Sequence, residues 1–395
     1  MNKLTIRVQK YLFVLLGVFI PTSIAVTNIL IGALVVCWLA EGKMATKLKL
    51  IKSSKWMLAI FSLIGFYVLG MLWGEIHLNA EWQFQRLALL LVFPILATIE
   101  LDQKTVEYGA TAFLITTFIS ALLAILINNK LVSPLGSFLP LINDSFEISA
   151  FIKYNYHNVL LALSVILCAY LIFENKTRHK NIAIIFVIVY AVSIFTEPGR
   201  AGQLLFNLSA VFYIFYYNSS KIFRCLALLL LLFSFQFLVY KTTKVYKNRF
   251  DTVSKIIKNN GYKSQGSVED FRYLVFRETL NKTIKKPFLG YGTGSFGTIF
   301  KNEIQNSGHY FDKHTTPHNQ YLYVWFELGI LGLVLLMLIF YYQAIDLFKK
   351  DNGIHRVLLP VSFILLMFID SYFFIFIVTI SYIYLYTIYS RYKLE

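Results

Sequence analysis

The chain has 395 residues, of which 57% are hydrophobic and only 15% are charged, and its mean hydropathy is +0.62. Soluble globular chains carry about 25% charged residues, so this composition argues against a soluble globular protein. Lys and Arg number 37 against 21 Asp and Glu, and the net charge of +16 is first a signal of orientation in a membrane. Largely uncharged runs of about 20 residues recur along the chain and predict an all-α, polytopic membrane protein.

Twelve apolar runs are predicted to span the membrane as helices. Pro21 interrupts the first stretch, so residues 9–41 form either a tight helical hairpin, which the count assumes, or one kinked span. The predicted spans are 9–22, 25–41, 56–74, 86–100, 105–127, 157–174, 181–196, 201–217, 222–240, 319–342, 355–369 and 371–389. They divide the chain into nine spans (1–240), a long polar loop (241–318) and three further spans (319–395).

Lys and Arg in the short loops orient the predicted helices. With the N-terminus inside, the inner segments hold 19 of these residues, and the short outer segments hold the remaining 4, which are Arg86, Lys130, Lys153 and Arg200. This split predicts that both termini are cytoplasmic. The loop 241–318 is then outside, and its own positive charge does not conflict with that, because long loops do not follow the charge rule.

Within the long loop, residues 266–290 (GSVEDFRYLVFRETLNKTIKKPFLG) predict an amphipathic helix. Phe271, Leu274, Val275 and Leu280 recur at helical spacing, and Pro287 with the glycine after it ends the pattern. We expect this helix to lie on the outer membrane surface, over a cavity between the spans.

Two arginine features on the predicted outer side could bind an anion. Arg200 lies in the very short turn TEPGRAGQL between two apolar spans, where an arginine is costly unless it is paired or faces water. The alternative is an interfacial arginine that extends to the headgroups. Arg272 and Arg277 lie five positions apart in the loop helix, so only one of them should point at a given site. The alternative there is a solvated basic face.

His318 follows the long loop directly and begins the tenth predicted span. A histidine at that boundary can take a proton near neutral pH, although it could instead be only an interfacial polar residue or a helix cap. His314 lies four positions earlier. Glu327 lies within the span, so it should face the interior of the bundle and be paired.

Together these strings resemble the superfamily of bacterial O-antigen ligases and polymerases. Arg200 to Leu204 matches an R-x3-L motif, and His318 with Gly329 matches H-x10-G. The string HNQYLYVWFELGILGL and the segment from Arg272 through KPFLGYGTGSF also resemble the family, in the family order. So does the arrangement of twelve spans with one long periplasmic loop before the histidine.

The resemblance implies an inverting glycosyltransferase with a GT-C-like fold that needs neither a metal nor a cofactor. The donor would be a glycan on undecaprenyl pyrophosphate, and the acceptor a sugar of lipid A-core. By motif match, Arg200 and Arg272 would bind the donor pyrophosphate, and His318 would be the catalytic base, with Glu327, Arg277 and His314 as supporting residues. The protein would lie in the bacterial inner membrane among its lipids, with the site facing the periplasm, and would have no nucleic-acid partner.

Two other readings remain open. A polymerase of O-antigen or capsule would share the fold and the arginines, and would differ in accepting a second lipid-linked glycan. A secondary transporter would also fit twelve spans, but it should show two similar halves, and none is visible in the sequence.

Overall fold

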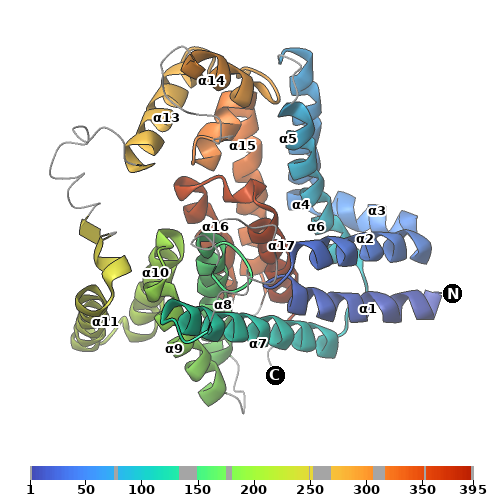
Figure 1. Ribbon diagram of the computed structural model, residues 1–395. Helices are drawn as coiled ribbons and strands as arrows, with labels where there is room; N and C mark the ends of the chain where they lie inside the picture. Colours follow the sequence, from blue (N-terminus) through green and yellow to red (C-terminus); the bar gives the residue numbers. More distant parts are fainter. Residues whose placement is uncertain are drawn as a thin grey trace. The chain divides into compact units, whose positions relative to one another are not determined.

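The computed structural model describes residues 2–74, 79–132, 149–174, 180–248, 250–251, 268–305, 316–350 and 353–392, and these ranges consist of helices joined by short turns (Figure 1). No extended strand occurs in the described ranges. The all-α prediction is therefore confirmed for this part of the chain.

The chain forms two compact units, each built from separate segments. The first comprises Met1–Tyr11, Ile31–Asp102 and Ser264–Arg391, and the second comprises Leu12–Leu30, Gln103–Lys263 and Tyr392–Glu395. Helices α1 (Asn2–Phe19) and α2 (Ile24–Glu41) are divided between them. The other helices of the first unit are α3 (Met44–Ser53), α4 (Lys55–Leu69), α5 (Asn79–Ala88), α6 (Val92–Thr98), α13 (Val268–Thr283), α14 (Ser295–Gln305), α15 (Gln320–Phe348), α16 (Gly353–Ile369) and α17 (Phe376–Arg391), with 3₁₀ turns η1 (Gly70–Leu72), η2 (Leu89–Leu91) and η4 (Tyr372–Phe374). The second unit adds α7 (Gln103–Asn128), α8 (Tyr154–Glu174), α9 (Lys180–Thr196), α10 (Arg200–Asn218) and α11 (Ile222–Thr242).

Helices α1 and α2 form the expected hairpin and not a single kinked span. The chain turns directly after α1, where the backbone N–H groups of Thr22 and Ser23 both donate to the carbonyl of Phe19 at 3.1 and 2.9 Å. The far end of α2 also contacts α1, because Gln9 donates to the Glu41 carboxylate at 3.3 Å.

Several helices have the length and apolar character that a membrane requires. Among the described residues, six meet both criteria: Ile24–Glu41, Lys55–Leu72, Gln103–Asn128, Tyr154–Phe173, Ile222–Thr242 and Gln320–Phe348. Three shorter apolar helices, Gln83–Thr98, Lys180–Thr196 and Gly353–Ile369, coincide with further predicted spans. The structure is therefore compatible with a polytopic membrane protein, while the number of twelve crossings stays a prediction.

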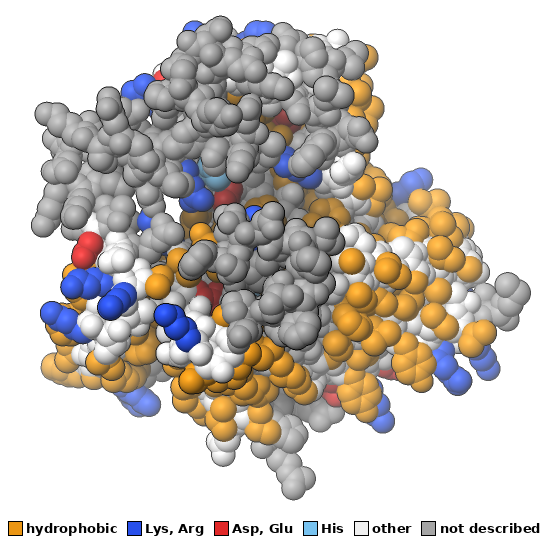
Figure 2. Space-filling view, viewed as in Figure 1, with side chains coloured by type: hydrophobic (Ala, Val, Ile, Leu, Met, Phe, Trp, Pro, Cys, Tyr) orange, Lys and Arg blue, Asp and Glu red, His pale blue; other side chains and the backbone are white. Residues whose placement is uncertain are grey.

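The apolar surface of these helices faces outward where a lipid phase would lie. On α11, Phe223 is 85% exposed and Phe233 75% exposed, and only 11% of the apolar stretch of this helix is buried. Figure 2 shows hydrophobic side chains gathered over α11 and over the α1–α2 pair. In water such a surface would be strongly unfavourable, whereas hydrocarbon solvates it well.

Each unit has one helix at its centre. In the first unit α15 packs against α4, α16 and α13, and in the second α8 packs against α7, α9 and α10. The apolar stretch of α8 is 78% buried, which fits its lack of a polar face.

The long loop contains α13, close to the predicted amphipathic helix, and a second helix, α14, that the sequence pattern did not indicate. Val275 on α13 is 1% exposed, and Thr279 and Thr283 continue the same buried face at intervals of four residues. The two threonine hydroxyls donate to backbone carbonyls of the preceding turn, so polar residues can lie against α15 without losing hydrogen bonds.

The segment 287–294, between α13 and α14, docks into a break in α15. At Gly329 the backbone has φ 67° and ψ −168°, which interrupts the helix. The carbonyls of Phe326 and Glu327 accept instead from the N–H groups of Tyr291 and Gly292 at 2.9 and 2.8 Å. In return, the N–H of Ile330 donates to the Pro287 carbonyl at 2.8 Å. The groups freed by the break are thus satisfied by the loop.

The other side of this segment is held by α4 and η1. Thr293 donates from its N–H to the Gly70 carbonyl at 3.1 Å and from its hydroxyl to the Tyr67 carbonyl at 2.5 Å. The Trp73 indole donates to the Leu289 carbonyl at 3.0 Å. The segment is therefore clamped between two helices, and the position of α13 follows from it.

A prediction concerns Gly329. A Cβ at this position would lie 2.0 Å from the Phe288 carbonyl oxygen, and its φ also disfavours any L side chain. We expect Gly329→Ala to lower the free energy of unfolding by about 1–3 kcal/mol, measured by thermal unfolding of the purified protein in detergent.

Gly65→Ala in α4 is the matched control, because nothing lies within 4 Å of a Cβ there. Alanine is favoured over glycine in a helix, so this variant should be neutral or slightly more stable. An unfolding temperature of Gly329→Ala equal to that of the wild type would contradict the docked arrangement.

Candidate active site

His318 lies in the turn immediately before α15, as the sequence predicted. Its φ is 53°, a left-handed conformation that is uncommon for a residue other than glycine. The cap of α15 is the next residue, Asn319, whose side-chain oxygen accepts from the Leu322 N–H at 2.9 Å. The alternative that His318 serves only as the helix cap is therefore wrong.

His318 is paired with an acidic residue that the sequence analysis did not single out. Its Nδ1 lies 3.2 Å from Oδ1 of Asp370, which directly follows α16, and the two side chains are 16% and 13% exposed. An ionised carboxylate can only accept hydrogen bonds, so Nδ1 must carry the proton that it shares with Asp370. In the neutral imidazole Nε2 then has no proton and can accept one.

The surroundings of Asp370 favour its ionised form. Burial raises the pKa of this carboxyl. The opposing effects are together larger, so that the pKa lies below its ordinary value; they are the hydrogen bond and charge of His318, the Ser371 N–H and the charge of Arg272. The Ser371 N–H donates to the same Oδ1 at 2.8 Å. Asp370 is therefore an anion at neutral pH and loses this charge, with its stabilisation, only as the pH falls through the lowered pKa.

Arg272 and Arg277 have different surroundings on α13. The positive charge of Arg272 lowers the pKa of Asp370, so this arginine lies within electrostatic range of the His318–Asp370 pair. Arg277 is bound instead to its neighbour Glu278, at 3.0 Å, and both side chains are exposed. The prediction that the two arginines differ in direction is consistent with these contacts. His314 lies outside the described residues.

Glu327 faces the interior of the first unit, as expected for an acid within an apolar helix. Its side chain is 0% exposed, and Oε1 accepts from the Gly294 N–H at 3.0 Å. Glu327 thus holds the end of the segment 287–294 with its side chain, while its carbonyl holds Gly292. This contact supports the position of the loop.

Arg200 belongs to the second unit and is the first residue of α10. The turn before it lies directly against α8: a Cβ on Gly199 would come within 2.6 Å of Asn158, and one on Gly202 within 1.9 Å. The two glycines therefore let the turn approach α8 closely. The side chain of Arg200 is partly exposed at the end of the helix.

Asp370 is the residue that motif reasoning missed. A signal was present, because this acid is the one residue between the eleventh and twelfth predicted spans and falls on the same outer side as His318. An acid at the end of an apolar helix is also the kind of residue that needs a partner. No local spacing linked it to His318, since the two are separated by 52 positions.

Among the residues that the structure describes, no group of three or more His, Cys, Asp or Glu side chains could hold a metal ion. His318 is paired with the carboxylate of Asp370, and the positive charge of Arg272 acts on that carboxylate. A guanidinium can bind an anion, and an oriented imidazole can assist the removal of a proton.

A match to a protein-family model agrees with the motif pattern. A comparison with curated proteins found no match. The family model described as O-antigen ligase matches residues 163–337, a range that contains Arg200, Arg272, His318 and Gly329 and ends before Asp370. The resemblance to the O-antigen ligase and polymerase superfamily is therefore confirmed over residues 163–337.

Proposed function

We propose that this protein is an O-antigen ligase. It transfers a glycan from undecaprenyl pyrophosphate to a sugar hydroxyl of lipid A-core, at the periplasmic face of the bacterial inner membrane. The observation that carries the proposal is the His318–Asp370 pair, because it supplies an oriented base, and the charge of Arg272 acts on the same carboxylate. The match to the O-antigen ligase family supports the same reaction class.

Arg272 and Arg200 bind the donor pyrophosphate in this proposal. The guanidinium group presents a planar fork of donors that matches phosphate oxygens, and it keeps its charge at any physiological pH. Negative charge grows on the pyrophosphate as its bond to the anomeric carbon breaks. Fixed guanidinium groups stabilise that charge without a metal.

His318 acts as the base on the acceptor. The hydroxyl oxygen of the acceptor attacks the anomeric carbon, the bond from this carbon to the phosphate oxygen breaks, and the undecaprenyl pyrophosphate departs with the electron pair. Nε2 of His318 takes the hydroxyl proton, and Asp370 stabilises the imidazolium that results. A single displacement of this kind inverts the anomeric centre.

The choice between ligase and polymerase is tested by the acceptor. Purified protein is incubated with a labelled lipid-linked glycan and, in parallel, with lipid A-core or with a second lipid-linked repeat unit. We expect label on lipid A-core and no lengthening of the lipid-linked glycan. Lengthening with no transfer to lipid A-core would establish the polymerase instead.

The arginines give the next prediction. We expect Arg200→Ala and Arg272→Ala each to lower the transfer rate by about 10²–10³-fold, since each removes a charge-assisted bond that strengthens in the transition state. Arg200→Lys should be nearly as damaging, because lysine keeps the charge but not the fork. Arg277→Ala is the control and should be mild, because Arg277 is bound to Glu278 on an exposed face. Full transfer by Arg200→Ala at normal expression would refute the donor assignment.

A further prediction separates a base from a simple hydrogen-bond donor at His318. Glutamine can donate but cannot take a proton at neutral pH, so His318→Gln should lower the rate by about 10²–10⁴-fold. Asp370→Asn should also be strongly damaging, because the amide no longer fixes the tautomer of the imidazole.

The control for this pair is His314→Ala, which lies outside the H-x10-G spacing and should cost much less. The measurement is the rate of transfer to lipid A-core. If His318→Gln turns over at the wild-type rate, His318 is not the base.

A further inference from the structure

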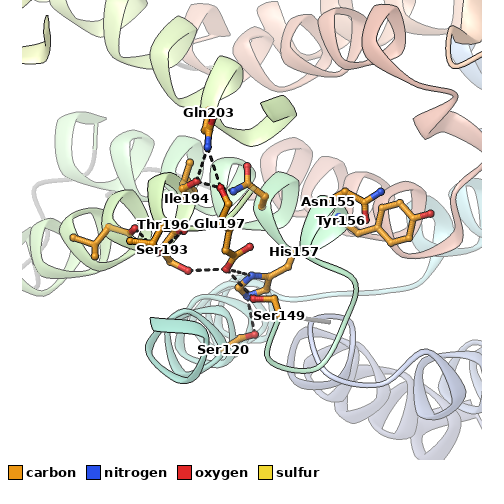
Figure 3. Close-up of polar contacts among 12 residues, drawn as sticks. Ser120, Ser149, Asn155, Tyr156, His157, Ser193, Ile194, Thr196, Glu197 and Gln203 are labelled. Atoms are coloured by element: carbon orange, nitrogen blue, oxygen red, sulfur yellow. Dashed lines mark hydrogen bonds and ion pairs between the residues drawn. The ribbon is translucent and has the colours of Figure 1, made fainter. Parts of the chain in front are cut away.

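Glu197, in the turn before Arg200, is the centre of a buried hydrogen-bond network in the second unit (Figure 3). The residue is 1% exposed, although it lies at the predicted outer end of two apolar helices. Its Oε1 accepts from the hydroxyls of Ser149 and Ser193 at 2.8 and 3.0 Å and lies 2.8 Å from Nδ1 of His157. One oxygen thereby joins the segment before α8, the first turn of α8 and the end of α9.

His157 extends this network to α7. Its Nε2 lies 2.9 Å from the Ser120 hydroxyl, and the imidazole is 1% exposed. When Nδ1 carries the proton and donates it to Glu197, Nε2 accepts from the Ser120 hydroxyl. Each hydrogen bond from Ser120 through His157 to Glu197 then has one donor and one acceptor. The Glu197 carboxylate therefore orients the imidazole of His157, and the Ser120 hydroxyl holds the other side of the ring to α7.

The backbone of the same turn is held as firmly as the side chain. Gln203 on α10 donates to the carbonyls of Glu197 and Ile194 at 3.1 and 3.2 Å. Asn158 on α8 donates to the Ile194 carbonyl at 2.9 Å and lies against the two glycines of the turn. The carbonyls of Ile194 and Glu197 are thus satisfied, and these bonds tie the end of α9 to α8 and to the first turn of α10, where Arg200 lies.

We propose that Glu197 and His157 are positioning residues for Arg200. They hold the turn 196–200 against α7 and α8 so that the guanidinium of Arg200 is presented to the donor pyrophosphate. The inference rests on the proposed role of Arg200 in donor binding and adds two residues that act through it.

The contacts indicate that geometry, and not the negative charge, is what the pair supplies. Oε1 contacts Ser149, Ser193 and His157, while the buried Oε2 has no hydrogen-bond partner among the residues that the structure describes. Glutamine can reproduce the acceptor at Oε1 without the charge. Alanine removes the acceptor and leaves three buried donors without it.

The test is donor and acceptor kinetics of the purified full-length protein with lipid-linked glycan and lipid A-core. Displacing a binding group by about 1 Å can cost about 10²-fold in rate, so we expect Glu197→Ala to lower kcat/KM for the donor by about that factor. The KM for lipid A-core should not change. Glu197→Gln should recover most of the loss, and His157→Asn, which keeps a donor toward Glu197, should recover more than His157→Ala.

Tyr190→Phe is the matched control. Tyr190 on α9 and Thr117 on α7 share a buried hydrogen bond of 2.9 Å. Tyr190 lies seven residues before Glu197, and the bond joins α7 and α9, which the Glu197 network also joins. Its loss should lower stability without changing donor kinetics. If Glu197→Ala cannot be purified as a folded protein, Glu197→Asp replaces it, since the shorter side chain withdraws the carboxylate from its donors, and the same expectation applies.

A double variant distinguishes failure of this inference from failure of the proposed function. If Glu197 acts through Arg200, Glu197→Ala together with Arg200→Ala should be no worse than Arg200→Ala alone. Additive losses, unchanged donor kinetics in Glu197→Ala, or equal damage by Glu197→Gln and Glu197→Ala would each overturn the positioning role. An unchanged donor KM and rate in Arg200→Ala would instead overturn the donor site itself.

Discussion

The contact between the segment 287–294 and the break in α15 is the constraint on which the first unit depends. A continuous helix would use the carbonyls of Phe326 and Glu327 internally, and the segment would have no place to bind. The break at Gly329 leaves these carbonyls without helical partners, and the N–H groups of Tyr291 and Gly292 donate to them. Helix α13, which carries Arg272, precedes this segment, and His318 precedes α15. The same contact therefore holds the helix that carries Arg272 near the helix that His318 precedes. The final glycine of the H-x10-G motif therefore has a structural explanation.

Buried carboxylates hold the turns of both units. Glu327 receives the Gly294 N–H, and Glu197 receives two hydroxyls and an imidazole. Burying an acid among apolar helices is expensive, and it is tolerated only where donors converge on it. Glu197 has three donors on one oxygen and lies in the turn before Arg200, whereas Glu327 accepts the Gly294 N–H and holds the segment 287–294. Rigidity at these turns is useful to a site that must recognise a charged group at a fixed position.

Asp370 has a different function from these two acids. It lies at the end of α16, outside the predicted spans, and its lowered pKa keeps it ionised beside His318. The ionised form orients the imidazole and would stabilise its protonated state after a proton transfer. Arg272 contributes to this ionisation with its own charge.

The sequence by itself determined the helical, apolar character of the chain and the candidate residues Arg200, Arg272 and His318, because run length, composition and short motifs are local properties. It also indicated the α1–α2 hairpin through Pro21 and the loop helix through its spacing. Only the tertiary structure decided the partners of these residues. Asp370 is 52 positions from His318, Gly294 is 33 from Glu327, and His157 is 40 from Glu197. Such pairs form because helices pack side by side and bring distant turns together, and no periodicity along the chain encodes which turns will meet.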